Sequence, residues 1–166
     1  MTSTRIELLQ RMPIFGAIND EALQFLLANA QARSLRRGEF LFREDDPASS
    51  MFVIESGRVA VFKSWQGREM LLRQLEAGDC VGEMALMDLY PRSASVRAVE
   101  DCSVIEIAAA DLHRLYEHDV EQFALIQMNI GREVCRRLRA MDDLMFHTWM
   151  GDTPVATSAG DVFRST

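Results

Sequence analysis

The sequence has few of the residues that metal and redox centres need. It contains three cysteines and three histidines in 166 residues. Cys80, Cys102 and Cys135 stand far apart, and no two of them have the close spacing of zinc or iron–sulfur ligands. We therefore expect small buried thiols in a reducing compartment, and no metal.

Long apolar runs are also missing from the start of the chain. The first residues, MTSTRIELLQRMPIF, contain neither the apolar core of a signal peptide nor a transmembrane segment. This absence predicts a cytoplasmic protein that does not contact the membrane.

Positive charge is scarce as well. The chain has 18 Lys and Arg against 25 Asp and Glu, and its net charge is −7 at pH 7. Nucleic-acid-binding proteins more often show a basic patch. Cations cluster only at Arg132, Arg136, Arg137 and Arg139, on an expected helix, where a solvated face is the simplest interpretation. Specific DNA binding is therefore not expected.

What the chain does contain is a pattern that changes twice. Residues from about 4 to 31 have helical spacing, residues from about 33 to 107 form short apolar runs between turn signals, and residues from about 109 to 149 are helical again. Many short strands indicate a sandwich, barrel or jelly roll. The expected strands are EFLF, MFVIE, RVAVFK, REMLLRQL, SVRAV and SVIEI. We predict one domain over residues 1–150 and a flexible tail over residues 151–166.

The segment GEMALMDLYPRSA, residues 82–94, places an isolated cation, Arg92, among small and apolar residues. A covered cation needs an anionic partner. The helix formers from Glu83 to Met87 would leave the first N–H groups of a short helical turn free to bind an anion. A guanidinium group and the hydroxyl of Ser93 suit a phosphate group.

Glu83 would repel that phosphate unless it accepts a hydrogen bond from a neighbouring group, such as a sugar hydroxyl. The residues therefore suggest a ligand with a phosphate and a nearby hydroxyl. A buried ion pair between Glu83 and Arg92 is the alternative, and the chemistry of the two residues leaves both open.

The same segment resembles the phosphate-binding cassette of the cyclic nucleotide-binding domain family, which reads F-G-E-hydrophobic-A-L, a spacer, P-R, a small residue and Ala. The matching residues are Gly82, Glu83, Ala85, Leu86, Pro91, Arg92 and Ala94. Upstream, RRGEFLFREDDPASSMFVIESGRVAVF resembles the first hairpins of the family. Asp45 departs from the family pattern, which usually has Gly there, and a positive φ at this position would strain an Asp.

The resemblance, which covers about residues 5 to 149, implies an α+β fold. Its centre is a β-roll, a jelly-roll type antiparallel barrel, flanked by N-terminal helices and by a long C-terminal closing helix from about residue 120 to 149. The implied phosphate ligands are Arg92, Ser93, Met84 and Ala85, and the implied ribose ligands are Glu83 and Gly82. Met141 and Asp142 fall, by their spacing from RRLR, where relatives of the catabolite activator type contact the base.

Fewer residues bear on the choice between adenine and guanine as the base of the ligand. Ser93 occupies a position where the family's cAMP sites and cGMP sites differ, and a Ser there is ambiguous. Asp142 can only accept hydrogen bonds, and guanine offers it two donors on one edge. We favour cAMP over cGMP because the rest of the chain most resembles the catabolite activator type.

The predicted function is that of a stand-alone cyclic nucleotide sensor, not an enzyme, which acts on an effector partner by conformational change or by self-association. The segment after Met150 is too short for a helix-turn-helix module. The alternative is a truncated sensor domain of a catabolite activator-type transcription regulator. A cupin-like enzyme would need several histidines on strands, whereas His113, His118 and His147 lie in the helical C-terminal zone.

The long helix also predicts a homodimer. Leu138, Met141 and Met145 repeat at helical spacing and need cover, which a second copy of the helix would supply. The alternative is a monomer whose helix folds back on its own β-roll.

Overall fold

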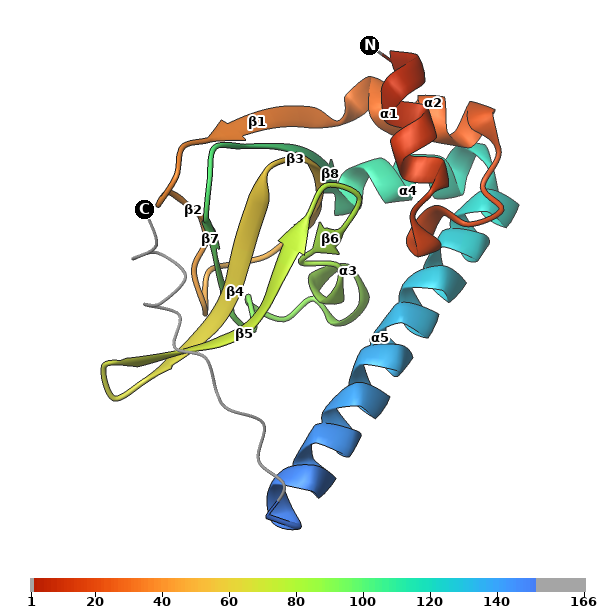
Figure 1. Cartoon of the computed structure of the whole chain (residues 1–166). Helices are drawn as coiled ribbons and strands as arrows, with labels where there is room; N and C mark the ends of the chain where they lie inside the picture. Colours follow the sequence, from red (N-terminus) through yellow and green to blue (C-terminus); the bar gives the residue numbers. More distant parts are fainter. Residues whose placement is uncertain (1, 152–166) are drawn as a thin grey trace.

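Two antiparallel sheets of four strands each make up the centre of the molecule in the computed structural model, which describes residues 2–151. The strand orders are β1-β8-β3-β6 and β2-β7-β4-β5. The strands are β1 Gln31–Leu35, β2 Phe40–Phe42, β3 Ser50–Ser56, β4 Arg58–Trp65, β5 Arg68–Glu76, β6 Cys80–Val81, β7 Ser95–Ala98 and β8 Cys102–Ala108. All six predicted strands are present and the predicted β-roll is confirmed (Figure 1).

β1 is not among the strands that the sequence predicts. It is an edge strand that pairs with β8, from Gln31 opposite Glu106 to Leu35 opposite Cys102. Only Leu35 of its five residues is buried. Since β8 supplies the hydrogen bonds and solvent covers most of the side chains, β1 needs no hydrophobic alternation, and the sequence carries no signal for it.

Two turns have the backbone conformations that the sequence suggests. Gly57, between β3 and β4, has φ +82°, and a Cβ there would lie 2.4 Å from the carbonyl oxygen of Asp101. Asp45 has φ 69°, so this position does use the left-handed region that favours glycine.

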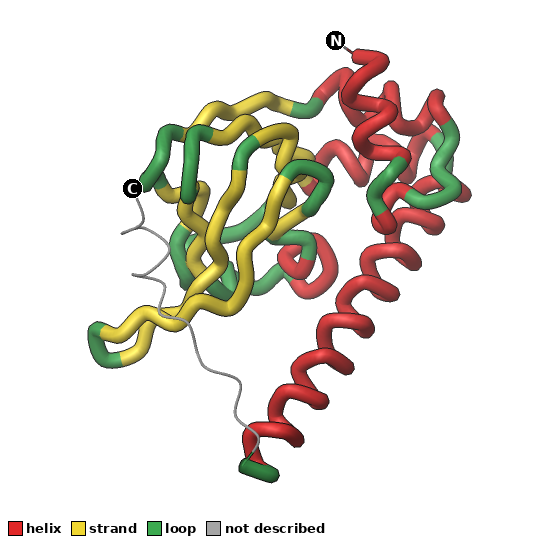
Figure 2. The backbone as a smooth tube through the Cα atoms, viewed as in Figure 1, coloured by secondary structure: helices red, strands yellow, loops and turns green. Residues whose placement is uncertain are grey.

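The helices are α1 Thr2–Gln10, the short 3-10 helix η1 Pro13–Phe15, α2 Asp20–Asn29, α3 Met84–Asp88, α4 Ala109–His118 and α5 Val120–Trp149. Most of the helices gather at one end of the β-roll, whereas the short helix α3 lies apart from them against the roll (Figure 2). Asn19 caps α2 by accepting a hydrogen bond from the N–H of Ala22 at 2.8 Å. Asn129 of α5 donates to the carbonyl oxygens of Ile14 and Gly16, which ties the start of α5 to the N-terminal segment.

α5 has two unlike halves. Its first half packs on the other helices through Ile126, Asn129 and Ile130. From residue 138 to residue 150 every side chain is exposed, and the helix runs away from the helical cluster (Figure 1). The predicted long helix is confirmed. The predicted tail, apart from its first residue Gly151, lies outside the described residues. No helix within residues 2–151 is long and apolar enough to cross a membrane.

Candidate functional site

Arg92 is the buried cation of the cassette, with 6% of its surface exposed. Its Nη1 donates to the carbonyl oxygen of Ser50 at 2.7 Å, and its Nη2 donates to Ser50 Oγ at 3.3 Å. The guanidinium carbon lies 4.1 Å from the ring centroid of Phe42. Arg92 Nε is buried and has no hydrogen-bond partner among the described residues. A carbonyl, a hydroxyl and a ring therefore hold this cation, and one of its donors is unused.

The backbone of Arg92 is fixed by the turn that contains Asp45. The N–H of Arg92 donates to the carbonyl oxygen of Asp46, and the N–H of Asp45 donates to the carbonyl oxygen of Arg92, both at 2.9 Å. Asp46 Oδ2 in turn accepts from the N–H of Arg43 at 2.8 Å. The departure at Asp45 is thus accommodated in a turn that positions the cassette arginine.

Burial lowers the pKa of Arg92 from its usual value, while the carboxylates of Glu106, Asp46 and Glu83 oppose that effect. Because the ordinary pKa of arginine lies so far above neutrality, the side chain stays charged at pH 7. A buried cation whose charge is disfavoured by desolvation gains stability from an anion placed beside it. The site around Arg92 is therefore suited to an anionic group.

Glu83 is buried more completely, with 1% of its surface exposed. Its Oε1 accepts a short hydrogen bond from Nη1 of Arg137 on α5, whereas its Oε2 is buried without a partner among the described residues. The Glu83–Arg92 ion pair that the sequence left open is not formed. Glu83 pairs with Arg137 instead, and one carboxylate oxygen remains available as an acceptor.

Arg137 corrects the prediction that the basic run on α5 is a solvated face. Its side chain is 22% exposed and reaches Glu83 on one side and Glu133 on the other, at 3.4 Å. Its neighbours Arg136 and Arg139 are exposed, as expected. The sequence gives a signal only for the contact with Glu133, because Glu133 and Arg137 stand four residues apart on the expected helix; nothing in it marks Glu83 as the second partner.

Gly82 leaves room for the Arg92 guanidinium group beside its own backbone. Its φ is +85°, and a Cβ there would lie 2.4 Å from Arg92 Nη1. The α3 helix that follows has five residues, and the N–H of Ala85 turns back to the carbonyl oxygen of Gly82 at 3.3 Å. Met84 and Ser93 lie at the surface beside the buried pair. The structure thus brings the predicted phosphate and ribose ligands together around one place.

Met141 and Asp142 are not part of that cluster. Both are exposed on α5, roughly 6–8 Å farther along the helix axis than Arg137 at about 1.5 Å per residue. Met141 follows Arg137 by four residues and shares its face of the helix. Asp142 follows by five and points to the opposite face. Met141 therefore lies on the same side of α5 as Arg137, and Asp142 lies on the opposite side.

Three polar residues near the site were not predicted. Ser50 donates through Oγ to Oε1 of Glu106 at 2.7 Å, so these two residues extend the set of groups around Arg92. Burial lowers the pKa of Arg73 on β5, and the charge of Arg137 acts in the same direction while that of Glu83 opposes it. Nothing in their local sequence marks them, because each is a strand residue whose role depends on which sheet face it occupies.

The expectation of three buried thiols is wrong for one of them. Cys80 and Cys102 are buried, but Cys135 is exposed on α5. Burial raises the pKa of Cys80 to about 12. The cysteine pattern in the sequence could not predict the difference, because exposure depends on the packing of α5, and none of residues 2–151 covers the face that carries Cys135.

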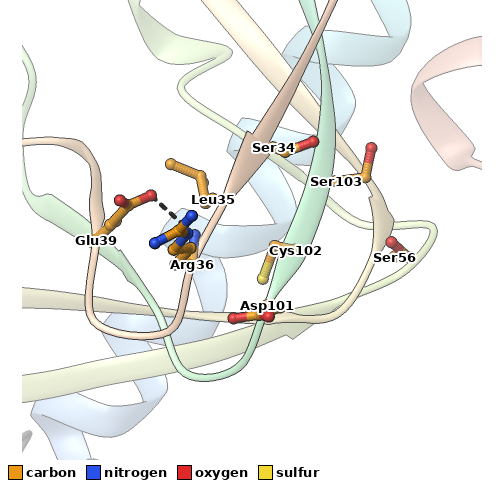
Figure 3. A pocket seen from close by; sticks show the side chains of 8 residues that line it. All are labelled: Ser34, Leu35, Arg36, Glu39, Ser56, Asp101, Cys102 and Ser103. Atoms are coloured by element: carbon orange, nitrogen blue, oxygen red, sulfur yellow. Dashed lines mark hydrogen bonds between the residues drawn. The ribbon is translucent and has the colours of Figure 1, made fainter.

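A separate hollow lies at the end of β1 and the start of β8 (Figure 3). Its lining residues are Ser34, Leu35, Arg36, Glu39, Ser56, Asp101, Cys102 and Ser103. The N–H of Arg36 donates to Glu39 Oε2 at 2.8 Å, which closes the turn between β1 and β2. None of the cassette residues lines this hollow. Within residues 2–151, no group of three or more His, Cys, Asp or Glu side chains is placed to hold a metal ion.

The comparisons with known proteins agree with this geometry. The family model for the cyclic nucleotide-binding domain matches residues 32–119. The chain is 30% identical over 131 residues to a "Cyclic AMP receptor protein" of Thermus thermophilus, which covers 78% of this chain and 59% of that protein. This chain therefore spans less than two thirds of that relative's length.

Two solved structures show the same fold. One is the N-terminal domain of a transcriptional regulator from Streptomyces coelicolor A3(2), with a TM-score of 0.68 and 31% sequence identity, covering 83% of this chain and 94% of that one. The other is a cyclic nucleotide-binding domain from Methylobacillus flagellatus, with a TM-score of 0.75 and 23% identity, covering 86% of this chain and 80% of that one. With a matching family model over more than half its length, this chain belongs to the cyclic nucleotide-binding domain family.

Proposed function

We propose that the chain binds one cyclic mononucleotide between Arg92 and Glu83 and acts as a regulatory module without catalysis. The observation that carries this proposal is a pair of buried, oppositely charged side chains that do not contact each other. Arg92 has an unused donor and Glu83 has an unused acceptor. A cyclic phosphate accepts hydrogen bonds from the guanidinium group, and the 2′-hydroxyl of the same nucleotide donates to the carboxylate. The α3 helix has only five residues, so its dipole contributes little to binding of the phosphate.

The ligand would also reach α5 through one contact. Glu83 already binds Arg137, so a hydroxyl that donates to Glu83 competes with or reorients that guanidinium group. A change at the ribose site is thereby transmitted to the helix whose second half is exposed. Through this link we propose that nucleotide binding alters either the packing of α5 or its association with a partner.

The exposed face of α5 supports the proposed homodimer. The residues of this α5 seam repeat at alternating spacings of three and four: Met128, Gly131, Cys135, Leu138, Asp142, Met145 and Trp149. This is the heptad pattern of a two-helix contact, and it lies on the side of α5 away from Ile126 and Ile130. A shallow hollow opens at Gly131 and Cys135, where a second helix could approach closely. In such a dimer, Asp142 would face the second copy.

The chain could serve as a stand-alone sensor or as the sensor part of a transcription regulator. The stand-alone function is the one we propose, with an effector protein or a second copy as the partner. The regulator remains the second candidate because the Streptomyces structure is described as the N-terminal domain of such a protein. The name of the Thermus relative supports cAMP as the ligand.

Calorimetric titration of nucleotide-free protein with cAMP, cGMP, 5′-AMP and 5′-GMP tests the proposal. We expect at least one cyclic nucleotide to bind with a stoichiometry of about one per chain. The open 5′-monophosphates should bind at least tenfold more weakly, because their second negative charge would be buried near the Glu83 carboxylate without a second cation. Absence of binding by both cyclic nucleotides would refute the proposed function.

A further inference from the structure

Glu106 of β8 and Ser50 of β3 are polar residues on a face of their sheet that is otherwise apolar. Alternate side chains of a strand lie on one face, so Glu106 shares its face with Val104 and Ser50 shares its face with Phe52. Val104 and Phe52 are buried in the hydrophobic cluster inside the β-roll. An apolar residue would be the ordinary choice at the two polar positions. We therefore looked for what the pair does beside Arg92.

Glu106 reaches Arg92 through a single hydroxyl group. Its Oε1 accepts a hydrogen bond from Ser50 Oγ at 2.7 Å, and the same Oγ accepts one from Nη2 of Arg92 at 3.3 Å. A serine hydroxyl has one proton, so donation to Glu106 leaves its lone pairs for Arg92. The other carboxylate oxygen of Glu106, Oε2, lies 3.8 Å from Nη1 of Arg33 on β1. The carboxylate thus fixes the direction of the hydroxyl group that holds the arginine.

Ser50 also determines which edge of the guanidinium group is left for a ligand. Its carbonyl oxygen accepts from Nη1 of Arg92 and its Oγ accepts from Nη2, so one residue occupies the end of the planar fork. Arg92 Nε has no hydrogen-bond partner among the described residues. The edge that contains Nε is therefore the one on which a phosphate oxygen would be bound.

The negative charge of Glu106 has an effect of its own. Burial lowers the pKa of Arg92, and of the three carboxylates that oppose this effect Glu106 acts most strongly. A carboxylate behind the cation reduces the attraction that the cation exerts on an anionic ligand. Coulomb's law makes this reduction twice as large for a ligand with two negative charges as for a ligand with one. Glu106 therefore disfavours a dianion more than a monoanion.

We propose that Glu106 is a specificity-determining residue that makes the site favour a singly charged cyclic phosphate over a doubly charged open phosphate, and that Ser50 is the positioning residue of the Arg92 fork. The inference rests on the proposed function, since both residues act on the same nucleotide site. Hydrolysis of the cyclic phosphodiester gives the 5′-monophosphate, which gains a second negative charge. Glu106 would thus help the site to distinguish the cyclic nucleotide from its own hydrolysis product.

The experiment is a set of calorimetric titrations of the whole chain at pH 7.5 with cAMP, 5′-AMP and the methyl ester of 5′-AMP. The methyl ester has an open phosphate with a single negative charge, so it separates the effect of charge from that of the cyclic ring. Weak ligands are measured by their displacement of cAMP, and the guanosine series is used if cGMP binds more tightly. The ratio of the affinities for cAMP and 5′-AMP is the quantity that decides, because a loss of folding or of general site geometry changes both alike.

Glu106→Gln keeps the size of the side chain and an acceptor for Ser50 but removes the charge. It should strengthen the binding of 5′-AMP about tenfold and that of cAMP and the methyl ester about threefold, so the preference for cAMP over 5′-AMP narrows about threefold.

Ser50→Ala loosens the fork and should weaken all three ligands about fivefold with unchanged ratios, whereas Ser50→Thr keeps the hydroxyl group and should restore the binding. The matched control is Glu100→Gln, which neutralises an exposed carboxylate paired with Arg58 and should behave as wild type.

Two results would overturn the role of Glu106: an unchanged or wider ratio of cAMP to 5′-AMP affinity in Glu106→Gln, or a methyl ester that follows 5′-AMP in place of cAMP. Unaltered binding in Ser50→Ala would overturn the role of Ser50. In each of these cases the proposed function stands, because a cyclic nucleotide still binds. If the wild type binds neither cAMP nor cGMP, the proposed function fails first and both roles fail with it.

Discussion

The inside of the β-roll and the second half of α5 are incomplete in opposite ways. Inside, Arg92 and Glu83 are buried polar groups with atoms that lack hydrogen bonds. On α5, Leu138, Met145 and Trp149 are apolar groups that lack cover, with 60%, 46% and 79% of their surfaces exposed. The first region is complemented by a small polar ligand, and the second by an apolar surface of another helix. The same molecule therefore has a polar site that needs hydrogen-bond partners and an apolar helix face that needs cover.

Arg137 stands where the two regions meet. It belongs to α5, lies at the end of the packed half of that helix, and contacts Glu83 inside the roll. If the two regions are coupled, the coupling passes through this ion pair or through the packing around it. Substitutions inside the β-roll should therefore affect ligand binding, and substitutions in the second half of α5 should affect self-association.

The largest effect on ligand binding is expected from Arg92. Substitution Arg92→Ala removes the cation that meets the phosphate, and we expect a loss of about 3–5 kcal/mol of binding free energy, which exceeds a hundredfold in affinity. Arg92→Lys should also bind poorly, because a point charge cannot reproduce the fork. Calorimetry with cGMP and cAMP measures both, and Arg58→Ala, which removes an exposed cation paired with Glu100, is the control. Near-wild-type affinity in Arg92→Ala would show that the buried cation is not the phosphate ligand.

On the α5 side, the double substitution Leu138→Asp and Met145→Asp should convert a dimer to a monomer. Each carboxylate would have to be buried against a second helix, and loss of the two apolar contacts removes about 3–6 kcal/mol. Multi-angle light scattering at micromolar concentration gives the mass directly. The exposed Cys135 offers a second readout, since mild oxidation should link two copies through it and Cys135→Ser should abolish the link. A wild type of monomer mass, with and without nucleotide, would contradict the α5 seam as an interface.

At the junction, Arg137→Ala should lower the stability of the ligand-free protein by about 2 kcal/mol, because it leaves the Glu83 carboxylate buried without a cation. The expected loss is smaller than for a fully buried pair since the Arg137 side chain is 22% exposed. Arg136→Ala is the matched control, because its partner Glu133 and its own side chain are more accessible and its loss should be close to neutral. Equal denaturant midpoints for the two variants would mean that the Glu83–Arg137 contact contributes no stability.

Local patterns were enough to predict most of the fold. Turn glycines, apolar alternation and helix caps specify β2 to β5, β7, β8, α2, α4 and α5, since these signals depend on a few neighbouring residues. β1 escapes this approach because its exposed side chains leave no periodic pattern and its pairing with β8 is set by the rest of the sheet. Cys135 was misplaced for the related reason that exposure on a helix depends on what covers that face.

The site was predictable only as far as its residues are close in sequence. Glu83, Gly82 and Arg92 were predictable from the sequence because one short segment, the cassette, contains all three. Arg137 is 54 residues from Glu83 and reaches it from α5. No local pattern distinguishes an arginine that faces solvent from one that faces a ligand site. The sheet register and the path of α5 decide this, and both are properties of the whole fold.

The smallest expected effect concerns the free oxygen of Glu83. Glu83→Gln keeps the size of the side chain and an acceptor oxygen, but it removes the charge, so a hydrogen bond from the 2′-hydroxyl should lose about 1–2 kcal/mol. The affinity for a cyclic nucleotide should fall about tenfold, while the 2′-deoxy analogue, which lacks this hydroxyl, should change much less. Titration of wild type and variant with both analogues gives a double-mutant cycle in which the coupling isolates the Glu83–hydroxyl contact from the loss of the Arg137 pair. A coupling close to zero would mean that the ribose lies elsewhere and that Glu83 serves only as the ion-pair partner of Arg137. Arg92 would then be the one buried group of this pair that needs a ligand.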